Sequence, residues 1–136
     1  MQATNATVPK ALSRWFIIHF VADITFALPL MIVPVQFLTI FGWQTVDPVA
    51  ARIVAAALFG IGIESLLGRN STPDSFKSML NLKIIWSLAT IIGVAWCLLS
   101  NVHGRPLGLW LIFAIFVAFN VLWVYWRVRI HKLLHP

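Results

Sequence analysis

Four long runs of apolar residues, separated by short polar segments, dominate the sequence. The runs cover residues 12–32, 48–67, 76–99 and 106–125. A helix needs about 20 apolar residues to cross the roughly 30 Å hydrocarbon core of a bilayer, and each run is long enough. The pattern therefore predicts an all-α fold, a four-transmembrane-helix bundle, and a single membrane domain that spans residues 1–136.

Proline, aspartate and glycine mark where the predicted helices begin and end. Pro34 suits the first turn of a new helix, and we expect residues 35–41 to form a short interfacial helix between the first two spans. Asp47 followed by Pro48 is the pattern of an N-cap and a first helical position. Gly68 suits the end of the second long helix.

The composition agrees with a membrane location. Of the 136 residues, 60% are hydrophobic and 10% are charged, against about 45–50% and about 25% in soluble domains. So few charged side chains cannot cover the surface of a small soluble domain, which argues against a soluble enzyme or a disordered tail. The net charge is +6, but the basic residues flank the apolar runs, so we expect the lipid bilayer as a partner and no nucleic acid.

Four spans place both chain ends on one side of the membrane, together with the loop between the second and third spans. That side holds eight of the ten basic residues: Lys10, Arg14, Arg69, Lys77, Lys83, Arg127, Arg129 and Lys132. The positive-inside rule then predicts a multi-pass integral membrane protein with cytoplasmic N- and C-termini. We expect Trp15, Trp123 and Trp126 in the aromatic belt on this side, and a last helix that continues through residues 126–132.

Each predicted span carries polar residues within its apolar run, at similar depths when about 1.5 Å is allowed per residue. Intramembrane polar groups usually face the bundle interior and often mark a site. His19 and Asp23 are four residues apart and so share one helix face. We hypothesise one ligand-binding site, with Trp86 on its apolar wall; its residues are His19, Asp23, Glu64, Lys83, Trp86 and Asn120.

A purely structural role for the same residues stays open. Glu64 and Lys83 can form an ion pair that fixes the helix register, or Lys83 can extend to the lipid headgroups. His19 and Asp23 can simply hydrogen-bond each other, and Asn120 can act as a clamp between helices. On the second span Ala56, Gly60 and Glu64 share one face. Small residues allow helices to approach closely, so this face is also a candidate contact in a homo-oligomer.

Three functional hypotheses follow. We prefer the binding of a small amphipathic or lipid-like ligand in an intrahelical polar pocket, with Asp23 and Glu64 anchoring its polar part. The second is an oligomeric proton-coupled transporter that uses Glu64 or Asp23, and the third is a structural subunit of a membrane complex. The sequence contains no nucleophile–base pair, glycine-rich phosphate loop or metal-ligand set, so we expect no metal and no cofactor, and nothing favours an enzyme.

Four segments in the first half of the chain form one succession, a span that ends in prolines, an interfacial helix and a second helix rich in small residues. They are Leu28-Pro-Leu-Met-Ile-Val-Pro34, Phe37-Leu-Thr-Ile-Phe-Gly-Trp43, Asp47-Pro-Val-Ala-Ala-Arg52 and Leu58-Phe-Gly-Ile-Gly62. With them, residues 12–68 resemble the DoxX-like group of small four-helix integral membrane proteins. The resemblance implies a four-helix bundle with a cavity between the helices, in a group of which some members associate with quinone-linked redox systems. The cysteine-based redox motifs of some relatives are absent, because Cys97 is the one cysteine in the chain.

Overall fold

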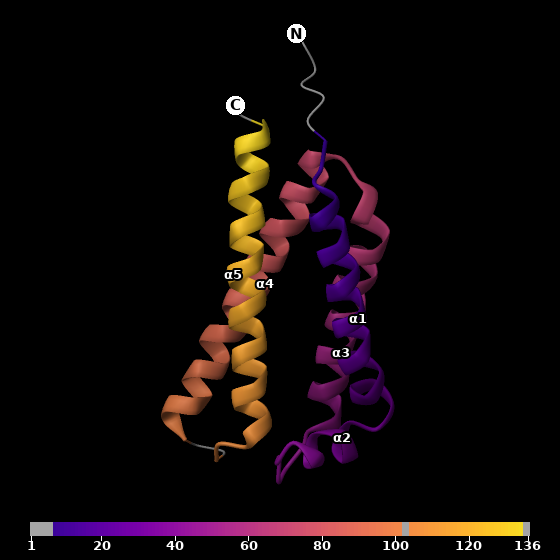
Figure 1. Cartoon of the computed structure of the whole chain (residues 1–136). Helices are drawn as coiled ribbons and strands as arrows, with labels where there is room; N and C mark the ends of the chain where they lie inside the picture. Colours follow the sequence, from indigo (N-terminus) through magenta and orange to yellow (C-terminus); the bar gives the residue numbers. More distant parts are fainter. Residues whose placement is uncertain (1–6, 102–103, 135–136) are drawn as a thin grey trace.

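The computed structural model describes residues 7–101 and 104–134, and the fold over these residues is all-helical (Figure 1). The elements are α1 (Lys10–Ile32), α2 (Pro34–Ile40), α3 (Pro48–Leu67), the 3₁₀ turn η1 (Gly68–Asn70), α4 (Pro73–Ser100) and α5 (Leu107–Leu134). The predicted fold class is confirmed: four long helices form the bundle, and a short helix lies between the first two.

Four helices are long and apolar enough to cross a membrane, namely α1, α3 with η1, α4 and α5. Large apolar side chains are exposed on each of them, for example Val21, Ile53, Ile85 and Val121. Such surfaces suit contact with lipid, which fits a multi-pass integral membrane protein. Helix α5 extends well past residue 125, as expected for a helix that continues beyond its apolar span.

Capping side chains set where α3 and α4 begin. The Asp47 carboxylate accepts hydrogen bonds from the backbone N–H groups of Val49 and Ala50, at 2.8 and 3.2 Å. This confirms the predicted N-cap. The Thr72 hydroxyl accepts in the same way from the Ser75 N–H, ahead of α4. Both caps satisfy backbone donors that the first turn of a helix otherwise leaves without a partner.

The bundle consists of two helix hairpins that lie side by side (Figure 1). Helix α1 packs along α3, and α4 packs along α5. Gly62 lets α1 and α3 approach closely, because a Cβ at this position would lie 2.8 Å from the Cβ of Asp23. The first hairpin has an apolar core of its own, made of Ala27, Leu30, Ala51, Ala55 and Leu58.

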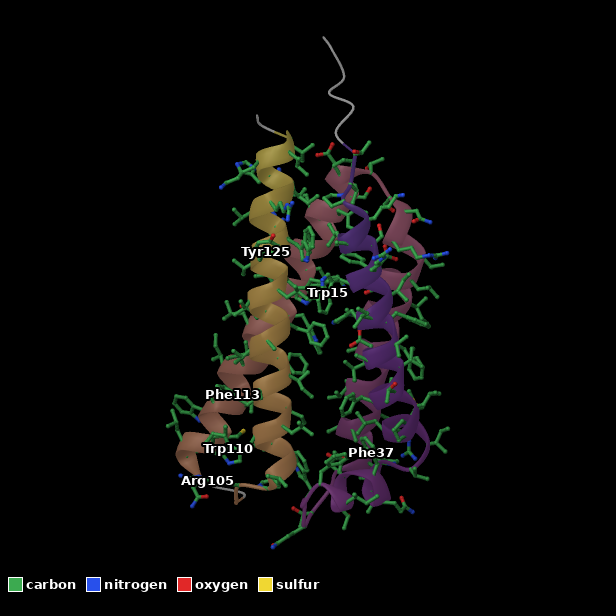
Figure 2. The ribbon with its side chains drawn as sticks, viewed as in Figure 1. Trp15, Phe37, Arg105, Trp110, Phe113 and Tyr125 are labelled. Carbon is green, nitrogen blue, oxygen red and sulfur yellow. The ribbon has the colours of Figure 1, made fainter. Side chains whose placement is uncertain are left out.

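The two hairpins meet at both ends of the bundle. Near the start of α1, an apolar core joins α1, α4 and α5; its residues are Leu12, Phe16, Phe76, Leu80, Trp123, Trp126 and Ile130. At the other end, where Figure 2 shows Phe37, Arg105 and Trp110, the Gly108 N–H donates to the Phe41 carbonyl at 2.9 Å. We name this contact the Phe41–Gly108 clasp. Between the core and the clasp, the two hairpins enclose the candidate site.

Candidate functional site

A cavity of about 200 Å³ lies between the two hairpins. Its walls come from all four long helices: His19, Ala22, Asp23, Phe26, Leu30, Val54, Leu58, Ile61, Lys83, Trp86, Ser87, Thr90, Ile112, Ile115, Phe116, Phe119 and Trp123. Along α1 the lining runs from His19 to Leu30, which is about 16 Å of helix. Most lining side chains are apolar, and the ionisable ones gather at the His19 end. The cavity is thus an apolar slot with one polar end.

Three buried side chains from three helices meet at that polar end. The Lys83 ammonium on α4 donates a hydrogen bond to the Ser65 hydroxyl oxygen on α3. Its Nζ also lies 3.2 Å from His19 Nδ1 on α1. The Ser65 hydroxyl donates to the Ile61 carbonyl at 2.7 Å, which leaves its oxygen free to accept from Lys83. With Asp23, these residues form what we name the polar cluster: His19, Asp23, Ser65 and Lys83.

Aromatic rings help to compensate for the burial of the Lys83 charge. Lys83 is only 3% exposed, and a buried ammonium without compensation is destabilised by several kcal/mol. Its Nζ lies 4.9 Å from the ring centre of Phe16 and 5.3 Å from that of Trp123. A cation over a ring face is attracted by the ring quadrupole, so these two contacts add to the hydrogen bonds from Lys83.

Asp23 carries a buried carboxylate oxygen beside the His19 ring. Its Oδ2 atom lies 3.0 Å from His19 Nδ1, one helical turn away. Because the Lys83 ammonium can only donate, we assign Nδ1 as its acceptor and place the ring proton on Nε2. With this tautomer the acceptor atoms Nδ1 and Oδ2 face each other at 3.0 Å and repel unless a further donor reaches Oδ2. Accordingly, Oδ2 is buried with no hydrogen-bond partner in the described part of the chain. Asp23 is 8% exposed and lines the cavity.

Trp86 and Asn120 have different positions relative to the cavity. Trp86 is one of its lining residues. Asn120 is not: its side-chain N–H₂ group donates to the Ser87 hydroxyl at 2.9 Å and to the Ile84 carbonyl at 3.2 Å. Asn120 therefore clamps α5 to α4, and it touches the site through Ser87, which lines the cavity.

Glu64 lies apart from the polar cluster. It is exposed on α3 and is not a lining residue of the cavity. Within the described residues, no ion pair joins it to Lys83. The next residue, Ser65, takes the inward position at this level of α3. The structure thus brings His19, Asp23, Lys83 and Trp86 together around one cavity, and it leaves Glu64 outside.

The face of α3 that carries Glu64 is also exposed at its small residues. Ala56 is exposed, and a Cβ added at Gly60 would have no heavy atom within 4 Å. The helix packs on α1 through a different set of mostly small residues, which are Ala51, Ala55, Leu58, Gly62 and Ser65. The Ala56–Gly60–Glu64 face is therefore unpartnered within one chain.

Sequence reasoning missed two hydroxyl groups and one aromatic ring of the site. Ser65 and Ser87 are buried at its polar end, but serine within an apolar helix commonly bonds its own preceding turn and so gives a weak signal. We had predicted Trp123 in the aromatic belt, but the structure places it inside the bundle. It is 1% exposed, and its ring centre lies 5.0 Å from that of His19.

The described residues contain no group of three or more His, Cys, Asp or Glu side chains that could hold a metal ion. No protein-family model, curated protein or solved structure matches the chain. What the site can do chemically therefore follows from its own geometry: an apolar slot, a buried acceptor that receives no hydrogen bond from the described residues, and a cation held beside it by three helices.

Proposed function

We propose that this membrane protein binds a small, mostly apolar molecule with one polar end in the cavity between its two hairpins. The observation that carries the proposal is the position of Asp23, whose buried Oδ2 faces His19 Nδ1, receives no hydrogen bond from the described residues and lies at the polar end of an apolar slot. A ligand group that donates a hydrogen bond to Oδ2 would remove the cost of leaving this acceptor unsatisfied.

The size of the cavity limits the ligand. About 200 Å³ is the liquid volume of roughly seven water molecules and is below the range of about 300–1,000 Å³ typical of sites for drug-sized ligands. A single ring or one short chain with a small head group fits this volume. A phospholipid with two acyl chains does not.

The chemistry of the lining narrows the ligand class further. Asp23 accepts hydrogen bonds, and the Lys83 ammonium beside it uses two of its three N–H donors on Ser65 and His19. A hydroxyl head group, which can both donate to Asp23 and accept from Lys83, therefore suits the polar end. The rings of Trp86, Phe116 and Phe119 supply apolar walls for the remainder of the molecule.

We propose that a ligand reaches the cavity from the side. The apolar core and the Phe41–Gly108 clasp lie at the two ends of the bundle. Val54 lines the cavity and is also 45% exposed, so the cavity wall is thin at this point. A shift of this side chain would admit an apolar ligand dissolved in the bilayer.

The direct test compares two carboxylates that differ in position. In native mass spectrometry of the purified protein, we expect a co-purifying small molecule, or added 4-butylphenol, to bind the wild type. Asp23→Asn should weaken the complex about tenfold, because an NH₂ group, which cannot accept a hydrogen bond, replaces one carboxyl oxygen. Glu64→Gln is the matched control, since Glu64 lies outside the cavity, and it should bind as the wild type does.

Two outcomes would remove this proposal: binding that survives Asp23→Asn unchanged, or equal weakening by both variants. Helical circular dichroism and gel filtration on each variant separate loss of binding from loss of the fold. Equal binding of 4-butylphenol and butylbenzene, which lacks the hydroxyl group, would also contradict a role for the polar end. The same holds if detergent fills the cavity of the purified wild type and neither compound displaces it selectively.

The exposed Ala56–Gly60–Glu64 face favours one further candidate, an assembly of several copies. A homo-oligomer through this face would cover Gly60 and enclose Glu64 between subunits, as the hypothesis of a proton-coupled transporter requires. Gly60→Leu would then block the oligomer, with Gly93→Leu on α4 as the control at another open glycine. Cross-linking in membranes reports the result, and a monomeric wild type contradicts this candidate.

We also propose that the end of the bundle where α1 begins and α5 ends faces the cytoplasm, because it carries most of the basic side chains. Labelling of single cysteines introduced near either terminus, in a Cys97→Ser background, tests this orientation. Membership of the DoxX-like group remains a prediction from the sequence.

A further inference from the structure

A second hollow, separate from the cavity, lies at the end of the bundle where α1 begins. It has a volume of about 540 Å³ and is formed by the start of α1, the turn η1 and the start of α4. Its lining residues are Thr7, Val8, Lys10, Ser13, Arg14, Arg69, Asn70, Ser71, Pro73 and Phe76, none of which lines the cavity between the hairpins. We name it the basic hollow.

The charge of the basic hollow is uncompensated. Lys10, Arg14 and Arg69 contribute three cations, and no acidic side chain lines the hollow. Among the described residues, Lys10 and Arg14 form no ion pair or side-chain hydrogen bond, and Arg69 uses only one of its five N–H donors, on the Leu66 carbonyl. The N-terminus of α4, at Pro73, adds partial positive charge, which Asp74 in the same turn partly offsets.

Part of the lining of the basic hollow is apolar. Val8, Pro73 and the fully buried Phe76 line it together with the three cations. The hollow also lies where the apolar spans end, beside the basic flanks that meet the headgroup layer. A group that fits must be anionic at one part and apolar close to it. We propose that the basic hollow binds the phosphate headgroup of an anionic phospholipid, with Lys10 and Arg14 as its principal cations.

The test measures binding of phosphatidylglycerol to the purified protein in detergent, by titration in native mass spectrometry. A Lys or Arg beside an anionic lipid changes the affinity about fivefold, so the double variant Lys10→Gln/Arg14→Gln should bind about 25-fold more weakly. The matched control is Arg129→Gln/Lys132→Gln on α5, which removes the same charge at the same end of the bundle but outside the hollow. It should change the affinity less than twofold.

Three results would overturn the proposal. Equal weakening by the control variant would mean that total charge, and not the hollow, attracts the lipid. Equally tight binding of zwitterionic phosphatidylcholine would mean that the anion is not recognised. Displacement of the lipid by millimolar inorganic phosphate would make a soluble phosphate compound the occupant. If the double variant does not fold, Lys10→Gln and Arg14→Lys decide: the first should lose about fivefold and the second should retain wild-type binding.

Discussion

Lys83 on α4 lies with its Nζ 3.2 Å from Nδ1 of His19 on α1, and this contact joins the two hairpins in the middle of the bundle. Away from the ends, the hairpins are separated by the cavity, so a polar contact here connects helices that otherwise have little direct packing. The same two residues form the polar end of the cavity. Lys83 and His19 therefore both stabilise the bundle and form part of the site.

Ser65→Ala should destabilise the protein by about 1–3 kcal/mol, because it removes a hydrogen-bond acceptor from the buried Lys83 ammonium. Unfolding in mixed micelles with increasing SDS measures the change. Ser100→Ala is the control, since Ser100 is exposed and contacts only the Cys97 carbonyl of its own helix; its effect should stay within about 0.5 kcal/mol. Equal effects would show that Ser65 does not support the charge.

Gly62→Ala and Gly60→Ala should change the free energy of unfolding in opposite directions. A Cβ at Gly62 would lie 2.8 Å from the Cβ of Asp23, so α1 and α3 must separate, at a cost of about 1–3 kcal/mol. A Cβ at Gly60 meets nothing within 4 Å, and alanine then stabilises the helix by up to about 1 kcal/mol. The SDS titration reads both. A destabilising Gly60→Ala would indicate that another chain covers this face.

These two glycines also illustrate why the sequence alone did not show which face of α3 packs within the chain. Ala56, Gly60 and Glu64 at a spacing of four form a visible stripe, and the acidic residue at its end drew the interpretation towards it. The face that packs has alternating spacings of four and three, through Ala51, Ala55, Leu58, Gly62 and Ser65. That alternation follows the 3.6-residue helix period more closely, but its polar member is only a serine.

The bundle itself was predictable because its causes are local. Apolar runs of sufficient length, the Asp47 cap and the proline breaks fix four long helices and a short one without reference to any partner. The position of Trp123 was not predictable in this way. It depends on which face of α5 meets α1 across the interface, and the apolar run of α5 leaves every face equally plausible for contact with lipid or protein.

Gly108→Ala should open the end of the bundle that carries α2. A Cβ at this position would lie 2.6 Å from the Cβ of Phe41 and would also clash with the ring of Trp43. The clasp hydrogen bond, 2.9 Å long, must lengthen as the helices separate. We expect a loss of about 1–3 kcal/mol and faster hydrogen exchange of the amide at position 108.

Gly93→Ala on α4 is the matched control for the clasp. No heavy atom lies within 4 Å of a Cβ at Gly93, and the residue is exposed within a helix. Alanine there should stabilise the protein by up to about 1 kcal/mol. If both variants behave alike, the Phe41–Gly108 contact does not hold the hairpins together. The clasp then does not close the bundle at the end that carries α2.

Ala22→Leu should fill part of the cavity and exclude its ligand while leaving the fold intact. Ala22 lines the cavity on α1, one residue from Asp23, so a larger apolar side chain enters empty space and not packed core. In a packed core the same enlargement is destabilising by about 1–3 kcal/mol. Here we expect unchanged or slightly raised stability, together with at least tenfold weaker binding of 4-butylphenol. The control is Ala118→Leu on the exposed face of α5, which should alter neither quantity.

A bundle that unfolds on Ala22→Leu would mean that the space is already occupied by packed side chains. Unchanged binding in a folded Ala22→Leu protein would place the ligand elsewhere, because the leucine side chain and the ligand cannot both occupy a slot of this size.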